Sequence, residues 1–484
     1  MKFTFLKRGK FWLRMLLFSI LLPLLIFGGV LFYVYENQDA LIQKKITSLN
    51  KQFKGEISIG DTHFSPFEHF PYIAIKIDDV HVYENKKSDS DTILSVADIY
   101  IGFSFDDIIQ GKYDIQNLSI EDGYFNIIFH EDGTTNLEKA FTTSEDTISS
   151  PPLEIHLQKI KLRNLDIHKY DEASKIDIET YIHEAKGGFQ TKNNLVSAHI
   201  DTKFELNVVD NADTTFVHHK HFDFHTDIEF NKENGLLAIQ PSGIKLEHGN
   251  FEIEGTVDTK NDMTLDLAIK GTKPNFDMFV AFVPSELIST LEHYKNAGKI
   301  YFNAAIQGPT TMGRKPYVNV SFGASDAFLE NTTEHKIIEN VGFQGHFTNG
   351  VDRDIRSMEF SLTEMTASLE TGMFTGSVVV KNFKEPEIDM SINSDFNIEF
   401  LAKFLNINDI ENIKGNVDLK MKFHDIIDLE HPEHALEKLN QAYFTELKVK
   451  DISFSSPSLP ANLKQLDMHL IMNGKQATLD QFEM

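Results

Sequence analysis

The sequence predicts a mostly β protein that follows a single N-terminal membrane helix. Three observations predict this class. Residues 15–35 form a run without a charged side chain. Apolar and polar residues then alternate at period two through most of the remaining chain, while segments with helical periodicity are few and short. Period two is typical of half-buried strands, because successive side chains point to opposite faces of a sheet.

The first 36 residues predict an uncleaved membrane anchor. A basic tail without a carboxylate, residues 1–14, precedes the apolar run, and the span is placed at residues 15–36. About 20 apolar residues cross a hydrocarbon core of roughly 30 Å, and the positive flank predicts a cytoplasmic N-terminus. A cleaved signal peptide is the alternative, but it has a shorter apolar core and a small-residue cleavage site. The residues expected at the two membrane interfaces are Trp12, Arg14, Tyr33 and Tyr35.

Composition narrows the class of function. The chain of 484 residues has a net charge of −26 and no cysteine. The acidic balance argues against nucleic acid and against peripheral docking on anionic lipid heads, since both need cationic surface. The lack of cysteine excludes a disulfide scaffold, a thiol enzyme and a cysteine-bound zinc site. No phosphate-binding loop, dinucleotide fingerprint, nucleophile elbow or zinc-protease motif is present, so we expect no enzyme, no catalytic residue and no cofactor.

The part beyond the membrane divides into two β regions. Apolar residues recur at helical spacing between Asp39 and Lys54, and period-two strands follow, so residues 37–140 are expected to form a first β module. Residues 141–152 are polar and end in two prolines, which predicts a flexible linker. Strand-like alternation resumes at residue 153 and continues to residue 484.

Three short helices are expected inside the second region. The clearest covers Pro284 to Asn296, where apolar residues follow helical spacing and Gly298 lies just past the end. A second covers about Asn397 to Leu405, and a third about Pro432 to Tyr443.

A degenerate repeat connects two parts of this region, at about residues 245–310 and 370–425. Each copy has two apolar strands, an Asn-Phe or Asp-Phe pair, a short apolar helix and a glycine that opens a further strand. Repeated strand units that stack along one axis make an elongated body. Alternation persists almost to Met484 with no polar cap, so the repeats are expected to continue beyond the given chain.

The best candidate for metal chemistry is the stretch from Val217 to Asp227. On a strand, His219, His221, Asp223 and His225 would lie on one face, and histidine with aspartate can bind zinc. Strand spacing would spread these groups over roughly 13 Å, too far for all of them to reach one ion. A solvated polar face is the favoured interpretation, and no metal site is expected.

One face of many successive strands carries branched aliphatic residues and phenylalanine. Two architectures fit this pattern equally. The first is a closed sandwich, whose core gives the same alternation. The second is an open, curved sheet whose apolar face receives lipid chains. Periodicity alone does not separate them, and the sandwich is favoured a priori.

The order of motifs in the first β module resembles the AsmA family of Gram-negative envelope proteins. After the anchor and a short helix come Gly55-Glu-Ile-Ser-Ile, Phe64-Ser-Pro-Phe, Phe70-Pro-Tyr-Ile-Ala-Ile-Lys-Ile-Asp-Asp-Val, Phe103-Ser-Phe-Asp-Asp-Ile-Ile-Gln-Gly-Lys, Ile115-Gln-Asn-Leu-Ser-Ile-Glu-Asp-Gly and Asp132-Gly-Thr-Thr-Asn-Leu137. The likeness covers most of the chain, because Gly255, the helix at Pro284 and Gly298 resemble the family's later repeat.

The resemblance implies a single-pass protein of the bacterial inner membrane with its bulk in the periplasm. It also implies an elongated β-groove related to the chorein-like bridge proteins, which passes phospholipid towards the outer membrane and supports outer-membrane integrity. A non-enzymatic scaffold that assembles outer-membrane proteins through strand edges is the alternative. The residues expected to line the groove are Ile73, Ile75, Ile77, Ile99, Ile101, Phe103, Phe125, Ile127 and Phe129.

Overall fold

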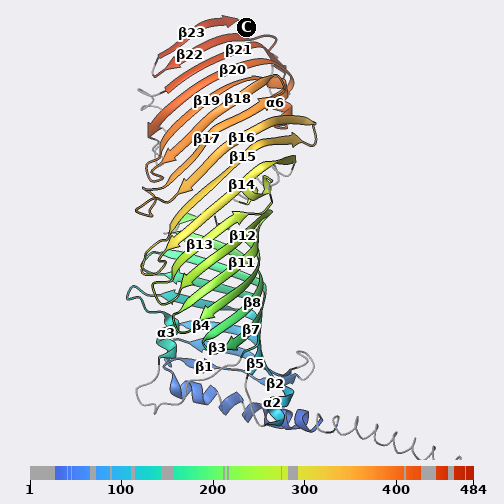
Figure 1. The fold of residues 1–484 in the computed structure, drawn as a ribbon, viewed down its shortest axis with the longest axis vertical. Helices are drawn as coiled ribbons and strands as arrows, with labels where there is room; N and C mark the ends of the chain where they lie inside the picture. The colour runs from blue at the N-terminus through green and yellow to red at the C-terminus, as the bar shows by residue number, and fades with distance from the viewer. Residues whose placement is uncertain are drawn as a thin grey trace, which may run out of the picture. The chain divides into compact units, whose positions relative to one another are not determined.

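The computed structural model describes two compact units, which divide inside one strand, after His225. Both are mostly β, as predicted, with a few short helices (Figure 1). The residues described are 25, 28–40, 42–44, 46–65, 72–87, 90–110, 115–142, 157–210, 213–214, 217–273, 275–281, 293–407, 410–426, 443–455, 463–474 and 476–483.

A helix precedes the sheet of the first unit. Residues 28–40, 42–44 and 46–52 are helical, in agreement with the predicted helix after the anchor. The side chains of Val34 and Ile42 are 2% and 5% exposed and pack in one cluster with strand residues such as Ile75. Tyr35 is exposed on this helix, and its ring meets the ring of Phe64 edge-on at a centroid distance of 6.3 Å.

The predicted membrane span, residues 15–36, falls mostly outside the described residues, as do Trp12 and Arg14. Within the part of the chain that the structure describes, no helix combines the length and apolar character needed to cross a bilayer.

The first unit is a twisted sheet of long strands with two short helices. Strands β3 to β5 form an antiparallel meander, to which β1 and β2 add on β3, and β6 to β8 form a second meander. The elements are β1 (Glu56–Ser58), β2 (Thr62–Ser65), β3 (Ile73–Tyr83), β4 (Thr92–Phe103), α2 (Phe105–Ile109), β5 (Ile115–Phe129), α3 (Asn136–Phe141), β6 (Lys159–Asp171), β7 (Ile176–Lys192), β8 (Leu195–Asp210), β9 (Asp213–Thr214) and the start of β10 (Lys220–Asn231).

The two meanders join through a parallel pair, β5 and β6, so the chain must cross over between them. The turn after β5 starts this crossover and leads into α3. Thr135 caps α3, because its side chain accepts from the backbone N–H of Glu138 while the Glu138 carboxylate accepts from the N–H of Thr135. The predicted linker at residues 141–152 lies almost entirely outside the described residues.

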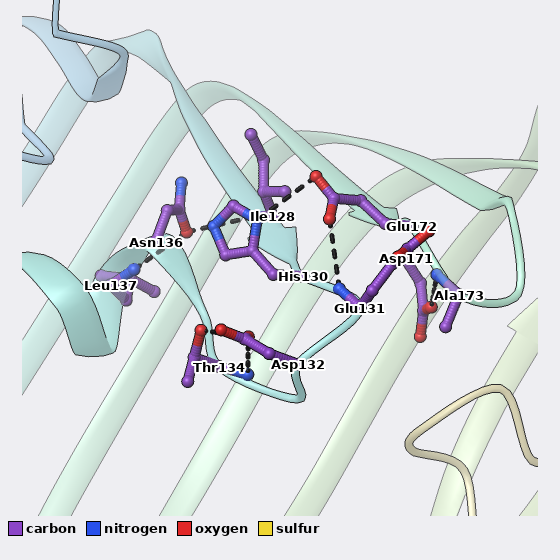
Figure 2. A network of polar contacts seen from close by, with 10 residues as sticks. All are labelled: Ile128, His130, Glu131, Asp132, Thr134, Asn136, Leu137, Asp171, Glu172 and Ala173. Carbon is purple, nitrogen blue, oxygen red and sulfur yellow. Dashed lines mark hydrogen bonds and ion pairs between the residues drawn. The ribbon is translucent and has the colours of Figure 1, made fainter.

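Asn136 fixes this turn from inside (Figure 2). Its side chain is completely buried. The Oδ1 atom accepts from the backbone N–H of Ile128 at 3.1 Å and of Leu137 at 2.9 Å, and Nδ2 donates to the carbonyl of Asn126 at 2.9 Å. A single amide therefore ties the end of β5 to the start of α3.

The second unit is a continuous antiparallel meander, in which each strand pairs with the next in the chain. After the end of β10 its elements are β11 (Leu236–Leu246), β12 (Gly249–Asp258), β13 (Thr264–Gly271), α4 (Asp277–Val280), β14 (Tyr294–Gly308), β15 (Tyr317–Asn331), β16 (Lys336–Thr348), β17 (Glu359–Leu369), β18 (Gly372–Lys381), β19 (Glu387–Asn397), α6 (Ile398–Phe404), β20 (Glu411–Ile426), β21 (Tyr443–Ser455), β22 (Asp467–Asn473) and β23 (Gln476–Glu483).

The predicted repeat appears as a recurring order of elements. Strands β12 and β13, helix α4 and strand β14 form one copy, and β18, β19, α6 and β20 form the other. The glycine expected to open the last strand lies inside that strand in both copies, at a break in strand register, with a positive φ of 156° at Gly298 and 120° at Gly415. A Cβ at Gly298 would lie 2.4 Å from the Cβ of Ala327, and one at Gly415 would lie 2.6 Å from the side chain of Ile452. The close approach of the next strand explains why both copies carry glycine here.

The helix predictions have mixed outcomes. Helix α6 with its caps Asn397 and Leu405 matches the second prediction. The first was wrong at its C-terminal end, because Tyr294 to Asn296 already belong to β14 and pair with β15; the part before residue 293 lies outside the described residues. The third prediction also lies outside them, except for Tyr443, which begins β21.

Candidate functional site

The nine residues predicted to line a groove share one face of the first unit. Strand register places β3 side chains opposite those of β4, and β4 side chains opposite those of β5. The pairs are Ile73 with Phe103, Ile75 with Ile101, Ile77 with Ile99, and Leu94 with Phe125. Ile127 and Phe129 follow Phe125 at period two on β5 and therefore join the same face.

This face is unevenly covered. Ile73, Ile75, Ile77 and Phe103 are buried and pack in the cluster that includes Val34 and Ile42 of the N-terminal helix. The remaining five predicted residues are half-buried. Lys169 lies over the ring of Phe129, with its Nζ 4.7 Å from the ring centroid. In this unit the predicted lining is thus part core and part half-exposed surface.

A line of left-handed residues crosses this unit and was not foreseen from the sequence. Asp79, Asp122 and Asn164 have φ values of 48°, 58° and 51° on strands β3, β5 and β6. The strand register continues unshifted past each of them, yet Ile77 and Val80, on either side of Asp79, pack in the same cluster despite their odd spacing. The left-handed residues keep the apolar face continuous where simple alternation would have turned it over. The only sequence signal was the recurrence of Asp and Asn, which tolerate a positive φ.

The second unit carries two unbroken rows of apolar residues on one face. In each row the members are register partners on successive strands. One row runs from β14 to β20, and the other runs from β13 to β19. Over seven strands, a spacing of about 4.8 Å gives a row of about 30 Å. One row is Phe302, Phe322, Gly345, Leu362, Val378, Met390 and Phe423, and the other is Ile269, Ala304, Val320, Phe347, Phe360, Val380 and Ile388.

Burial on this face depends on the two short helices. Where α4 lies on the sheet, Phe251 and Phe302 are 4% and 7% exposed and pack with Met278. Where α6 lies on it, Leu369 packs with the buried rings of Phe400 and Phe404. Away from the helices, every member of the two rows from β17 onward is only half-buried.

These observations distinguish the two architectures that periodicity left open. The inner face of a sandwich is packed by a second sheet and is dry at its centre. Among the described strands of this unit, each pairs sideways with its neighbours, and the members of the two rows from β17 onward lack such burial. This part of the second unit therefore presents an open apolar face, and the sandwich that was favoured a priori does not fit it.

The opposite face is polar and cross-linked by ion pairs. In the first unit, Lys76 binds Asp78 at 2.9 Å and Asp98 at 2.8 Å, and its hydrogen bonds to Asp98 and Asp78 raise the pKa of Lys76 above its ordinary value. In the second, Glu446 lies 2.8 Å from Lys448 and 3.1 Å from His469. Hydrogen bonds from Lys448 and His469 lower the pKa of Glu446 to about 2.

The depressed pKa of Glu446 predicts a loss of local stability in acid. A carboxylate with a folded-state pKa of about 2 and an ordinary value of 4.5 stabilises the fold above pH 4.5, and this contribution disappears as the pH falls towards 2. Hydrogen exchange of β20–β22 should therefore show that Glu446→Gln weakens protection at pH 6 but much less at pH 3. In a Lys448→Gln background the substitution should matter less at pH 6. An equal effect of Glu446→Gln at both pH values would contradict the ion-pair explanation.

The histidines singled out for metal binding engage carboxylates on the neighbouring strand. His219 and His221 lie 2.5 Å and 3.7 Å from Glu205, and His225 lies 2.5 Å from Asp201. Their side chains are 57%, 62% and 58% exposed. On the other side of the strand, Phe222 stacks on Phe204 at 4.9 Å, so the predicted division into a polar and an apolar face is observed.

One other group of residues has the composition of a metal site. Glu387, Asp389 and His424, on β19 and β20, place one ligand atom each within 4.8 Å of one another; among the described residues no other trio does so. All three are substantially exposed, and His424 already forms an ion pair with Asp389. The arrangement fits the ion-pair pattern of this polar face.

Comparison of the sequence with protein-family models and with characterised proteins, and of the fold with solved structures, finds no match.

Proposed function

We propose that this protein holds the acyl chains of phospholipids on its apolar face and passes them along the sheet between the two membranes of a bacterial envelope. The single observation that supports the proposal is the pair of apolar rows on β13–β20, whose side chains remain half-exposed from β17 onward. A soluble protein rarely leaves so long an apolar strip without a ligand or partner. Each CH₂ group of a lipid that leaves water on such a strip contributes about 0.8 kcal/mol.

The proposal includes the location and mode of transport. The apolar run at residues 15–36 would anchor the chain in the inner membrane, and the remainder would lie in the periplasm. The resemblance of the first module to the AsmA family supports this orientation. Transfer would be passive and non-enzymatic, with the polar headgroups left in water at the edges of the strip.

Photo-crosslinking tests the proposal on the full chain in bacterial membranes. A benzophenone amino acid placed at Val378 should yield phospholipid adducts after irradiation, because this residue belongs to an apolar row. The matched control is Val379, the next residue of β18, which points to the opposite face. Mass spectrometry of the isolated adducts identifies what is bound.

Three results are informative. Lipid adducts at residue 378 and none at residue 379 support lipid carriage. Protein adducts alone at residue 378 would replace it with the scaffold alternative. Equal labelling at the two positions, or none at either, would contradict a ligand held on the apolar face.

A further inference from the structure

The hairpin loops at one edge of the second unit expose apolar side chains. They connect β12 to β13, β14 to β15, β16 to β17 and β18 to β19, at the edge opposite the one that carries α6 (Figure 1). We call residues 259–263, 309–316, 349–358 and 382–386 the loop rim. The exposed fractions are 40% for Met263, 66% for Met312, 91% for Val351 and 50% for Ile355. Burying such side chains would normally stabilise a fold, so four of them on three successive loops point to an external partner.

The loops of the rim are tied to one another. The backbone N–H of Thr310 donates to the carbonyl of Asp262 at 3.0 Å. Arg353 Nη1 donates to the carbonyl of Lys315 at 3.1 Å, and the N–H of Phe383 donates to the carbonyl of Ile355 at 2.9 Å. Each bond joins one hairpin to the next, so the exposed side chains are presented by a connected surface.

The charge of the rim differs from that of the chain. Its four segments contain six lysine and arginine residues and four carboxylates, an excess of two positive charges in a protein with a net charge of −26. Arg314 forms an ion pair with Asp262 of the neighbouring loop at 2.6 Å. Arg356 and Lys384 are exposed here, together with Asp352 and Glu385, while Asp354 accepts hydrogen bonds from backbone N–H groups of its own turn. Because screening limits charge interactions to about 8 Å at physiological ionic strength, this small local excess of positive charge, and not the net charge of the chain, acts on a surface that approaches the rim.

We propose that the loop rim docks on a bilayer that contains anionic phospholipid, with Met312, Val351 and Ile355 inserted among the headgroups. The cations would meet the negative surface, where each contributes about 1 kcal/mol, and the apolar tips would leave water. Protein interfaces instead favour tryptophan, tyrosine and arginine in packed pockets. The exposed apolar residues of the rim are methionine, valine and isoleucine, with no exposed aromatic ring among them. This proposal differs from the expectation based on net charge alone, and it does not depend on lipid carriage by the apolar face.

A dye attached to the rim tests the proposal. The chain has no cysteine, so Val351→Cys in the full-length protein can be labelled at one position with an environment-sensitive fluorophore. The matched control is Thr333→Cys, an exposed position in the β15–β16 turn at the opposite edge. Any membrane binding by the N-terminal segment is common to both labelled proteins, so the comparison isolates the rim.

The expected result is a blue shift at residue 351 with vesicles of phosphatidylcholine and phosphatidylglycerol, a smaller shift with phosphatidylcholine alone, and none at residue 333. Arg356→Glu and Lys384→Glu should each lower the vesicle affinity reported by the residue 351 dye by at least about fivefold. The proposal is overturned if the dye at residue 351 stays in water, if both positions respond alike, or if it responds to concentrated protein without vesicles. That last result would assign the rim to contacts between protein molecules.

Discussion

Replacing Asn136 by leucine is expected to destabilise the first unit by about 3 kcal/mol. Leucine has a similar branched shape but no polar group, so the N–H groups of Ile128 and Leu137 and the carbonyl of Asn126 lose their partner. An unsatisfied polar group in a protein interior costs about 1–3 kcal/mol. Hydrogen exchange measured by mass spectrometry should show faster exchange in the end of β5 and in α3, which Figure 2 places around this amide.

Thr134→Ala is the matched control for this experiment. Thr134 lies two residues away on the same turn, and its exposed hydroxyl bonds only the neighbouring Asp132. We expect a change of less than about 1 kcal/mol for the control. Similar exchange rates in the two variants would show that the buried amide does not hold the crossover together.

The second large effect is expected from Gly255→Ala in β12, which should cost about 3 kcal/mol or more. Gly255 has a φ of 142°, and an added Cβ would lie 2.1 Å from the backbone carbonyl oxygen of Asp266 on β13. Neither the left-handed conformation nor a backbone clash can be relieved by a side-chain rotation. Thermal unfolding by circular dichroism, with hydrogen exchange to locate the loss in β12 and β13, measures the effect.

Gly376→Ala is the matched control for Gly255→Ala, and the second copy of the repeat supplies it. Gly376 occupies the corresponding position of β18 in the second copy, but it is not among the glycines with positive φ. Its added Cβ would approach the carbonyl of Ser391 no closer than 3.0 Å. Gly376→Ala should therefore stay within about 1 kcal/mol of the parent protein. If the two alanine variants were equally stable, the geometry at Gly255 would not be the reason for glycine there.

These two glycines illustrate how far the sequence can predict the fold. The repeat is visible in the chain, and its strands and short helices occur in the predicted order. The sequence treats Gly255 and Gly376 as equivalent, yet only one is required by its backbone. The difference arises because strand β13 approaches one position more closely, and such an approach depends on the twist of neighbouring strands.

For the candidate site, too, the sequence predicts some features and misses others. Alternation places the predicted residues of each strand on one side of that strand, because side-chain direction in a strand is a local property. The strand register brings the residues of the three strands to one face. Alternation did not foresee the line of left-handed residues at Asp79, Asp122 and Asn164. It also missed the rows on β13–β20, which become continuous only when strand register aligns residues far apart in the chain.

The sequence by itself determined the β class, the division of each strand into a polar and an apolar side, and the order of the repeated elements. These follow from local preferences that each short segment carries. Only the tertiary structure decided that the apolar face of the second unit is open, that α4 and α6 cover parts of it, and that four hairpins share one edge. Burial is a property of neighbours in space, and the same alternation serves a dry core and an open surface.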